Sequence, residues 1–465
     1  MVQTSERLTA GTAVPAHGIS FGDALLVWAR IAALSFGGPA GQIALMHRVL
    51  VEEKRWIGER RFLHALNYCM LLPGPEAQQL ATYIGWLMHG VRGGLAAGLL
   101  FILPGFLSIL GLSFVYVLYG GTALLDGVFL GLKAAVLVIV VQALLRIASR
   151  ALKGRLQVAV AVAAFLALAV LHLPFPLVIV LAGLFGFLAS WLSLPGFDRR
   201  ATAPIPGAAA PSDEGTALGE AVPAHARPTV GWSLKMAAIL GLLWAAPVLA
   251  SWLVFGPGNV FTAIGLFFSK MAVVTFGGAY AVLAYVAQEA VGHYGWLKPG
   301  EMLDGLALAE TTPGPLIMVL QFVGFLGAYR QPGAMAPLEA ATLGAVLTTW
   351  VTFLPCFLFI FLGAPFIERL RGNHSLSAAL SAITAAVVGV IANLALWFAV
   401  HTLFADVVSW QAGPITLDLP QPASIRPFAL MLTAGAAFLV FAMRVSVMPL
   451  LGLAALAGIL INRLS

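Results

Sequence analysis

The sequence predicts an all-α polytopic membrane protein made of two inverted-topology repeats with broken or re-entrant helices. Three observations support this: the composition, a set of landmarks that recurs along the chain, and glycine–proline breaks inside hydrophobic segments. Of the 465 residues, 60% are hydrophobic and 9% are charged, whereas a soluble domain carries about 25% charged residues. Several apolar stretches exceed the roughly 20 residues that one membrane span requires.

The chain divides into two repeats, a linker and one additional helix. Residues 196–232 are rich in Pro, Gly, Ala and charge, as flexible linkers are. We assign 1–195 to the first repeat, 196–232 to a flexible cytoplasmic linker, 233–253 to a topology-inverting helix and 254–465 to the second repeat. Each repeat holds six hydrophobic segments. Because six is even, the first repeat ends on the side of the membrane where it began, and one additional span then starts the second repeat on the opposite side. The second repeat is therefore inverted, as in many secondary transporters. The segments lie near 22–46, 61–90, 94–119, 122–147, 155–171 and 174–195, and near 260–290, 301–328, 338–363, 376–400, 428–442 and 446–462.

Landmarks of the first repeat return in the same order in the second, which indicates an internal duplication. Four of them are displaced by 240 residues: 35–38 (SFGG) returns as 275–278 (TFGG), 73–75 (PGP) as 313–315, Arg30 as Lys270 and Trp56 as Trp296. Two more are displaced by 251 residues: 102–107 (ILPGFL) corresponds to 353–358 (FLPCFL), and 134–136 (AAV) corresponds to 385–387.

Glycine and proline interrupt the first two segments of each repeat, which either span with a kink or turn back as re-entrant hairpins. The loop at 47–61 carries five Lys or Arg residues. Hairpins would place this loop on the same side as the N-terminus. The positive-inside tendency therefore favours hairpins, with the loop and the N-terminus in the cytoplasm.

The breaks also have the chemistry of helix starts. Pro39, Pro75 and Pro315 each stand where a new half-helix would begin, a position that favours proline, and the preceding glycines let backbone approach a ligand closely. A helix start offers unpaired N–H groups and about half a positive charge, which favours an anion. The alternative is that Gly and Pro only permit bending and close packing. The substrate-binding candidates at these tips are Gly37, Gly38, Pro39, Pro73, Gly74, Pro75, Gln78, Gln79, Gly277, Gly278, Pro313, Gly314 and Pro315.

Ionisable residues inside hydrophobic segments are costly and usually functional. Arg30, Lys270 and Lys133 are candidates to balance the charge of an anion, although each could instead snorkel to the interface. Glu76 directly follows Pro75, and Glu310 precedes Pro313 by three residues. Both are candidates to carry a proton during transport, and Glu76 has the alternative role of stabilising its own helix dipole.

Other classes of protein lack support. We attribute the net charge of +6 to Lys and Arg in cytoplasmic loops, and expect no binding to nucleic acid. Cys69 and Cys356 lie in apolar segments, and the sequence has no HExxH, P-loop or CxxC motif. We therefore expect no disulfide, metal or other cofactor and no enzymatic activity.

The motifs at 35–39 (SFGGP) and 71–79 (LLPGPEAQQ) are repeated at 275–278 (TFGG) and 311–315 (TTPGP). In these motifs the sequence resembles the chromate ion transporter (CHR) superfamily. The resemblance is to its long-chain, two-domain members and covers nearly the whole chain apart from the linker and the tail. It implies a bacterial inner (plasma) membrane protein that exports chromate, driven by the proton-motive force as a proton-coupled antiporter, and that confers chromate resistance. One departure is Ala279, which stands where FGGP would have proline, and it points to weaker binding or a scaffold role for the second tip.

The direction of transport follows from electrostatics as well. Moving one charge through 100 mV is worth roughly 2.3 kcal/mol, so an exported dianion gains about 4.6, whereas uptake would need at least two co-transported cations. Sulfate shares the shape and charge of chromate and is a second candidate substrate. The alternatives are another oxyanion carrier, a channel or a membrane-embedded enzyme, and a homodimer is one candidate assembly.

Overall fold

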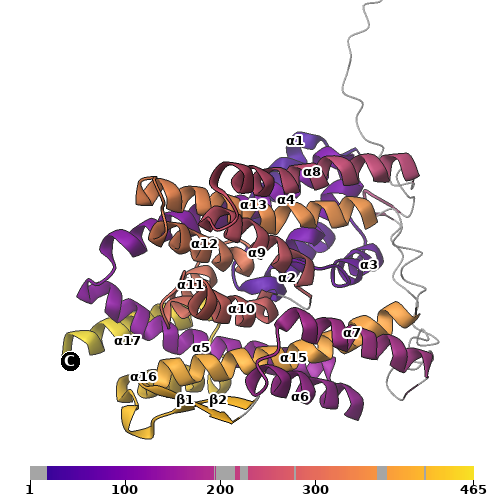
Figure 1. Ribbon diagram of the computed structural model, residues 1–465. Helices are drawn as coiled ribbons and strands as arrows, with labels where there is room; N and C mark the ends of the chain where they lie inside the picture. Colours follow the sequence, from indigo (N-terminus) through magenta and orange to yellow (C-terminus); the bar gives the residue numbers. More distant parts are fainter. Residues whose placement is uncertain are drawn as a thin grey trace, which may run out of the picture.

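The computed structural model describes residues 18–192, 194, 215–219, 229–276, 279–363, 374–412 and 415–464, and within them the regular structure is almost entirely helical (Figure 1). The first half of the chain contains α1 (Phe21–Ala33), α2 (Gly38–His47), η1 (Arg48–Glu53), α3 (Glu59–Cys69), α4 (Glu76–Tyr119), α5 (Ala123–Ala151), α6 (Arg155–Ala169) and α7 (Phe175–Trp191). The additional helix is α8 (Val230–Phe255). The second half contains α9 (Val260–Val274), α10 (Ala279–Gln288), η3 (Glu289–His293), α11 (Glu301–Thr311), η4 (Leu316–Met318), α12 (Val319–Arg330), α13 (Pro337–Gly363), α15 (His374–Leu403), α16 (Pro427–Ala437), η7 (Phe438–Ala442) and α17 (Val447–Leu464).

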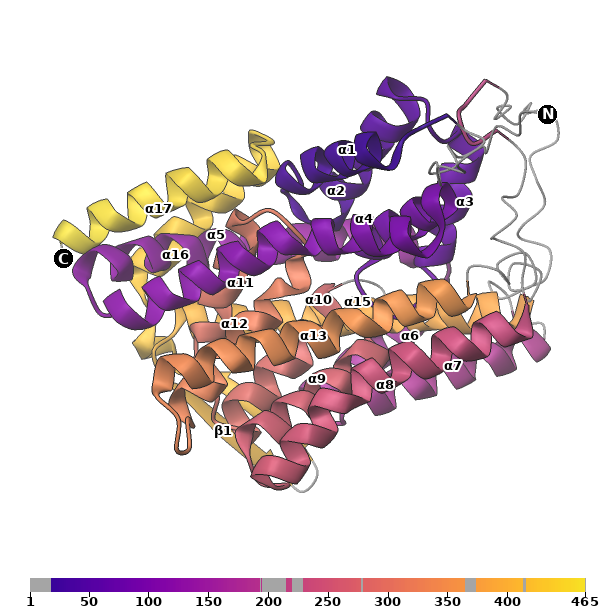
Figure 2. The same cartoon turned by 90° about the horizontal axis from the view of Figure 1, so that it is seen from above.

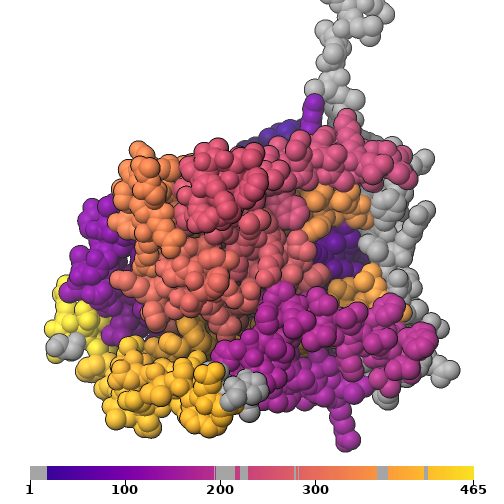
Figure 3. Space-filling model, viewed as in Figure 1, coloured from indigo at the N-terminus to yellow at the C-terminus, as the bar shows by residue number. Residues whose placement is uncertain are grey.

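Among the described residues, six helices are long and apolar enough to cross a membrane, which confirms the all-α polytopic prediction. They are α4, α5, α8, α13, α15 and α17. Large apolar side chains such as Leu253 and Val254 on α8 are more than 70% exposed, and α8 lies at the surface of the molecule (Figure 3). Contiguous apolar surface of this extent is typical of a face that contacts lipid.

The first broken segment folds back on itself. Gly37 and Gly38 take positive φ angles of 82° and 71°, and the chain reverses there between α1 and α2. Lys54 lines a shallow pocket together with Asp23, so the two ends of the segment lie side by side. This is the geometry of a hairpin.

The second half repeats this reversal between α9 and α10. Trp296, which follows η3, stacks on Phe268 of α9 at a ring distance of 5.9 Å and contacts Phe267 edge-on. The middle of α9 and the chain beyond η3 are thus held together by an aromatic cluster.

Helix α4 consists of two arms, 76–88 and 91–119, joined at His89 and Gly90, whose backbone angles are not helical. A Cβ placed on Gly85 would lie 2.4 Å from the carbonyl oxygen of Gly93. The arms therefore pack antiparallel with their backbones almost in contact. In the second half, α12 and α13 pack in the same way through Gly324 and Gly344.

The two halves exchange their last helices. α7 and α6 pack against α15 of the second half, whereas α17 and α16 pack against α5 of the first half. Figure 2 shows α17 and α16 beside α5, and α6 and α7 along α15. Since α5 and α15 also contact each other, as do α4 and α13, the halves share one core.

Two features were not expected from the sequence. β1 (Val407–Ala412) and β2 (Ile415–Pro420) form an antiparallel hairpin between α15 and α16. Most of the predicted linker, 196–232, lies outside the described residues. Its described part at 215–219 contacts the loop before α3 and the first turn of that helix. The Leu218 amide donates to the Trp56 carbonyl (3.0 Å), and Arg61 of α3 donates to the Gly219 carbonyl (2.8 Å).

Candidate functional site

A new helix begins at each described break. Pro39 lies in the first turn of α2, Pro75 caps the N-terminus of α4 and Pro315 caps that of η4. Before the last two, Gly74 and Gly314 take φ angles of +121° and +106°, a region that L side chains rarely adopt. Gly277 and Gly278 lie outside the described residues.

Each Pro-Gly-Pro turn is bonded to the glycine break of the other half. The Gly74 amide donates to the Thr275 carbonyl (2.7 Å), and the Gly314 amide donates to the Ser35 carbonyl (2.9 Å). Ser35 and Thr275 are equivalent positions, and so are Gly74 and Gly314. We call the place where 35–38, 73–75, 275–276 and 313–315 meet the central junction.

The same reciprocity holds for packing at the central junction. A Cβ on Gly314 would lie 3.0 Å from the Cα of Gly105 on α4, and a Cβ on Gly74 would lie 2.9 Å from Sγ of Cys356 on α13. Gly105 and Cys356 are again equivalent, at the displacement of 251 residues. Two independent sets of contacts thus connect each turn to the opposite half.

Four glutamines surround the central junction, and none is more than 1% exposed. The sequence singles out Gln78 and Gln79 but misses Gln42 of α2 and Gln321 of α12. The signal for these two is an amide inside an apolar segment, but neither follows a Pro-Gly-Pro motif as closely as Gln78 and Gln79 do.

The side-chain amides of these glutamines donate their hydrogens to backbone or hydroxyl oxygens. Gln42 donates to the Gly314 carbonyl (2.6 Å) and Gln79 to the Pro73 carbonyl (2.7 Å). Gln78 donates to Thr82 Oγ1 (3.1 Å), and Gln321 to the Phe106 carbonyl (3.0 Å). Within the described part of the chain, Oε1 of all four is buried and accepts no hydrogen bond.

The predicted matched cations lie elsewhere. Arg30 forms an ion pair with Glu53 at 3.2 Å, and its side chain is 51% exposed. Lys270 donates to the Tyr285 hydroxyl at 3.3 Å and is exposed on α9. Among the described residues that are buried, none is Lys or Arg. The role of this pair in balancing an anion stays a prediction.

The two predicted proton carriers flank the Pro-Gly-Pro turns. Glu76 is in the first turn of α4. Glu310, at the end of α11, is 3% exposed and accepts a hydrogen bond from the Tyr280 hydroxyl. A carboxyl group therefore stands beside each turn, although the tyrosine partner is present in the second half alone.

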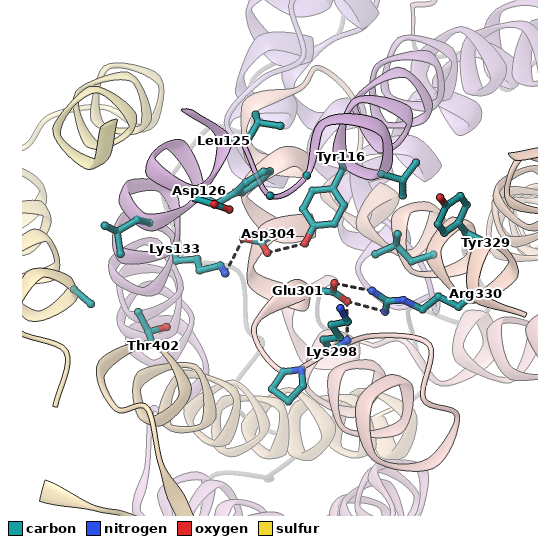
Figure 4. Close-up of a pocket in the computed structure, with 18 of the residues that line it drawn as sticks. Tyr116, Leu125, Asp126, Lys133, Lys298, Glu301, Asp304, Tyr329, Arg330 and Thr402 are labelled. Atoms are coloured by element: carbon teal, nitrogen blue, oxygen red, sulfur yellow. Dashed lines mark hydrogen bonds and ion pairs between the residues drawn. The ribbon is translucent and has the colours of Figure 1, made fainter. Parts of the chain in front are cut away.

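Lys133 lines a cavity of about 630 Å³ at the ends of α4, α5, α11 and α12 (Figure 4). Its Nζ lies 3.1 Å from Oδ1 of Asp304, and the other carboxylate oxygen, Oδ2, accepts a hydrogen bond from the Tyr116 hydroxyl at 3.0 Å. Beside them Arg330 forms two hydrogen bonds to Glu301 (2.7 and 2.8 Å). The basic residues that line the cavity are Lys133, Lys298, Arg330 and Arg426, and the acidic ones are Asp126, Glu301 and Asp304.

Comparison of the sequence with known proteins identifies a family. The chromate transporter family model matches residues 22–187 and 262–459. The chain belongs to the chromate transporter family. The chromate transport protein of Pseudomonas aeruginosa is 34% identical over 373 residues, which cover 77% of this chain and 76% of that protein. That of Cupriavidus metallidurans is 26% identical, covering 90% of this chain and 92% of its own, and the probable chromate transport protein of Synechococcus elongatus is 27% identical over 85% and 91%.

No solved structure matches the chain. The family and the six apolar helices establish a multi-pass bacterial membrane protein of the long, two-domain form. These relatives are described as transport proteins, so the chain is a transporter and not an enzyme.

Proposed function

We propose that the protein exports chromate across the inner membrane as a secondary transporter driven by the proton-motive force, and that it binds the anion at the central junction. The observation that carries the proposal is the reciprocal pair of hydrogen bonds, from Gly74 to Thr275 and from Gly314 to Ser35. Equivalent groups exchanging equivalent bonds are what a two-fold relation between the halves produces. We infer from it that the halves are inverted repeats about a site at mid-membrane, as in other secondary transporters.

The binding site would use helix starts. The first-turn N–H groups of a helix have no partner within the helix, and α2, α4 and η4 all begin at the central junction. Their partial positive charges favour an anion without a buried lysine or arginine. Of the remaining candidates, Gly37, Gly38 and Pro73 would shape this surface, and Gln78 and Gln79 would line it.

The cavity around Lys133 would be the outer entrance. Two of its four basic residues are paired with acidic side chains of the cavity, so Lys298 and Arg426 would supply the positive charge that attracts an anion at that end. Asp304 at its wall and Glu310 beside the central junction are six residues apart on α11, or about 9 Å at 1.5 Å per residue. In the predicted topology the loops that line this cavity face the outside.

Protons would be carried by Glu76 and Glu310, which flank the two Pro-Gly-Pro turns. A carboxyl group that is protonated on one side of the membrane and ionised on the other couples transport to the proton gradient. A carrier is favoured over a channel because the turns interlock and bury the central junction: Gly74, Pro75 and Gly314 are all buried.

Radiolabelled anion uptake into everted membrane vesicles tests the function. We expect chromate to accumulate when respiration energises the vesicles and accumulation to stop when a protonophore is added. Counterflow of labelled chromate against unlabelled chromate would identify a carrier, since a channel shows none. Accumulation of sulfate but not of chromate would make sulfate the substrate instead.

A further inference from the structure

We propose that the central junction binds chromate in its singly protonated form, hydrogen chromate, and that a glutamine oxygen accepts the O–H hydrogen bond of the ligand. This rests on the proposed function and adds to it the ionic form of the substrate. It follows from which atoms of the buried glutamines are left free.

The orientation of these amides is settled by their partners. The oxygen and nitrogen of an amide are hard to distinguish unless the hydrogen-bond network decides. The atoms facing the Gly314, Pro73 and Phe106 carbonyls must be nitrogens, because a carbonyl oxygen accepts and cannot donate. For Gln78 the partner is Thr82 Oγ1. The hydroxyl of Thr82 donates its own hydrogen to the backbone carbonyl of Gln78, so Thr82 Oγ1 can only accept from the Gln78 side chain.

What remains unpaired is therefore a set of four buried acceptors, beside which Gln78, Gln79 and Gln321 each have one further amide N–H beyond the bond given above. Each glutamine leaves Oε1 without a donor among the described residues, and buried acceptors are rarely left unpaired in folded proteins. A fully ionised tetrahedral oxyanion carries acceptors alone: it could accept from the remaining amide N–H groups, but it would leave these oxygens without a donor. A singly protonated oxyanion carries one O–H donor for a glutamine oxygen, while its other oxygens accept from the helix-start N–H groups.

The charge of the site agrees with a monoanion. Among the buried residues of the described chain, the charged types are Asp304 and Glu310, and none is Lys or Arg. Glu76, in the first turn of α4, adds a second carboxyl group beside the central junction. Partial charges at helix starts then supply positive field at the central junction, and they match one negative charge better than two. One proton on the ligand halves the charge that must enter an interior without a buried cation.

This form of binding would also select the substrate. Chromate takes up a proton near neutral pH, so a sizeable fraction is hydrogen chromate inside a cell. Sulfate and selenate take up a proton only in strong acid and remain dianions at the same pH. The site would thus distinguish tetrahedral anions of the same shape by whether they carry a proton. It would bind hydrogen chromate in the presence of an excess of sulfate.

Equilibrium binding to the purified full-length protein, measured between pH 6 and 9 with chromate, sulfate and selenate, tests the inference. We expect the dissociation constant for total chromate to rise about tenfold per pH unit above the pKa of hydrogen chromate, and to be constant when expressed for hydrogen chromate alone. Selenate stays a dianion throughout this range, so it should bind at least about tenfold more weakly than chromate at pH 6 and with an affinity that does not change with pH; it is therefore the control for titration of the protein itself.

The Gln79→Met and Gln42→Met variants locate the acceptor. In at least one of them the preference for chromate over selenate should fall about tenfold or more, with a melting temperature that shows the protein folded. Chromate affinity that is independent of pH, or selenate binding as tightly as chromate, would overturn the inference and leave the export function standing. No chromate binding at any pH would instead overturn the proposed function.

Discussion

At the scale of single residues, Gly74 and Gly314 fill places that no side chain can take without moving the opposite half. Both combine a φ that L residues avoid with a neighbour about 3 Å from where a Cβ would be, Cys356 Sγ for Gly74 and Gly105 Cα for Gly314. The sequence identifies both glycines because a Pro-Gly-Pro break is a local feature. It cannot identify what they touch, because those partners lie more than 200 residues away.

Replacing either glycine by alanine should therefore damage the central junction. We expect Gly314→Ala and Gly74→Ala each to cost about 1–3 kcal/mol of stability from backbone strain, and to weaken chromate binding by about tenfold or more. Gly111→Ala on α4 is the matched control, since nothing lies within 4 Å of its Cβ. Thermal unfolding and equilibrium binding measure the two effects. Wild-type binding by both variants would mean that the turns are packing features and the anion site lies elsewhere.

Arg30 and Lys270 lead to a different expectation now that their contacts are known. Sequence reasoning makes them counter-charges for the anion, yet both are exposed and each bonds within its own hairpin. An exposed ion pair contributes about 0–1 kcal/mol, so Arg30→Gln should leave chromate binding within about twofold. Abolished binding in a folded Arg30→Gln protein would restore its role as an anion ligand.

The importance of Gln42 and of Asp304 depends on contacts with residues that are far away in the sequence. Gln42 is one polar residue in an apolar segment, and its importance arises from the Gly314 carbonyl, 272 residues away. Asp304 pairs with Lys133 of the other half, a contact that no spacing along the chain could reveal.

At the scale of elements, the hydrophobic segments correspond closely to the helices. The predicted segment at 61–90 ends where α4 folds at His89 and Gly90, because the change of direction needs a glycine with positive φ that the sequence displays. The β-hairpin was missed although 407–420 carries β-branched residues on both sides of a Gly-Pro pair, which is a hairpin signal. The hydrophobic segments alone do not reveal a hairpin of this kind.

The hairpin geometry gives a prediction about topology. In a protein without Cys69 and Cys356, a cysteine at Lys54 should resist an impermeant thiol reagent applied to intact cells and react in everted vesicles. Lys54 suits this test because it is exposed, whereas Gly58 in the same loop is buried. Ala123→Cys, at the exposed start of α5 beside the Lys133 cavity, is the control and should react from outside. Labelling of Lys54→Cys in intact cells would mean that the first segment spans the membrane.

At the scale of the whole molecule, small residues bring the exchanged helices together. A Cβ on Gly131 of α5 would lie within 2 Å of the Ala454 carbonyl on α17, and one on Gly389 of α15 would lie 2.1 Å from the Ala161 carbonyl on α6. Such close approach is how helices associate in a bilayer, where the hydrophobic effect does not drive them together. The recurring landmarks predicted a duplication, but the exchange of helices depends on these contacts and could not be predicted from the landmarks.

Because each half packs its last two helices against the other, the protein should survive a cut in the linker. A protease site inserted at 205–206 precedes, in the sequence, the segment 215–219 that contacts Trp56 and Arg61. After cleavage in mild detergent we expect the two fragments to co-purify and chromate binding to persist. A Gly131→Ile substitution should then release the fragments, because an isoleucine there cannot fit between α5 and α17. Gly241→Ile on α8 is the control, since its Cβ would meet nothing within 4 Å. Fragments that separate without any substitution would show that the linker, and not the exchanged helices, holds the halves together.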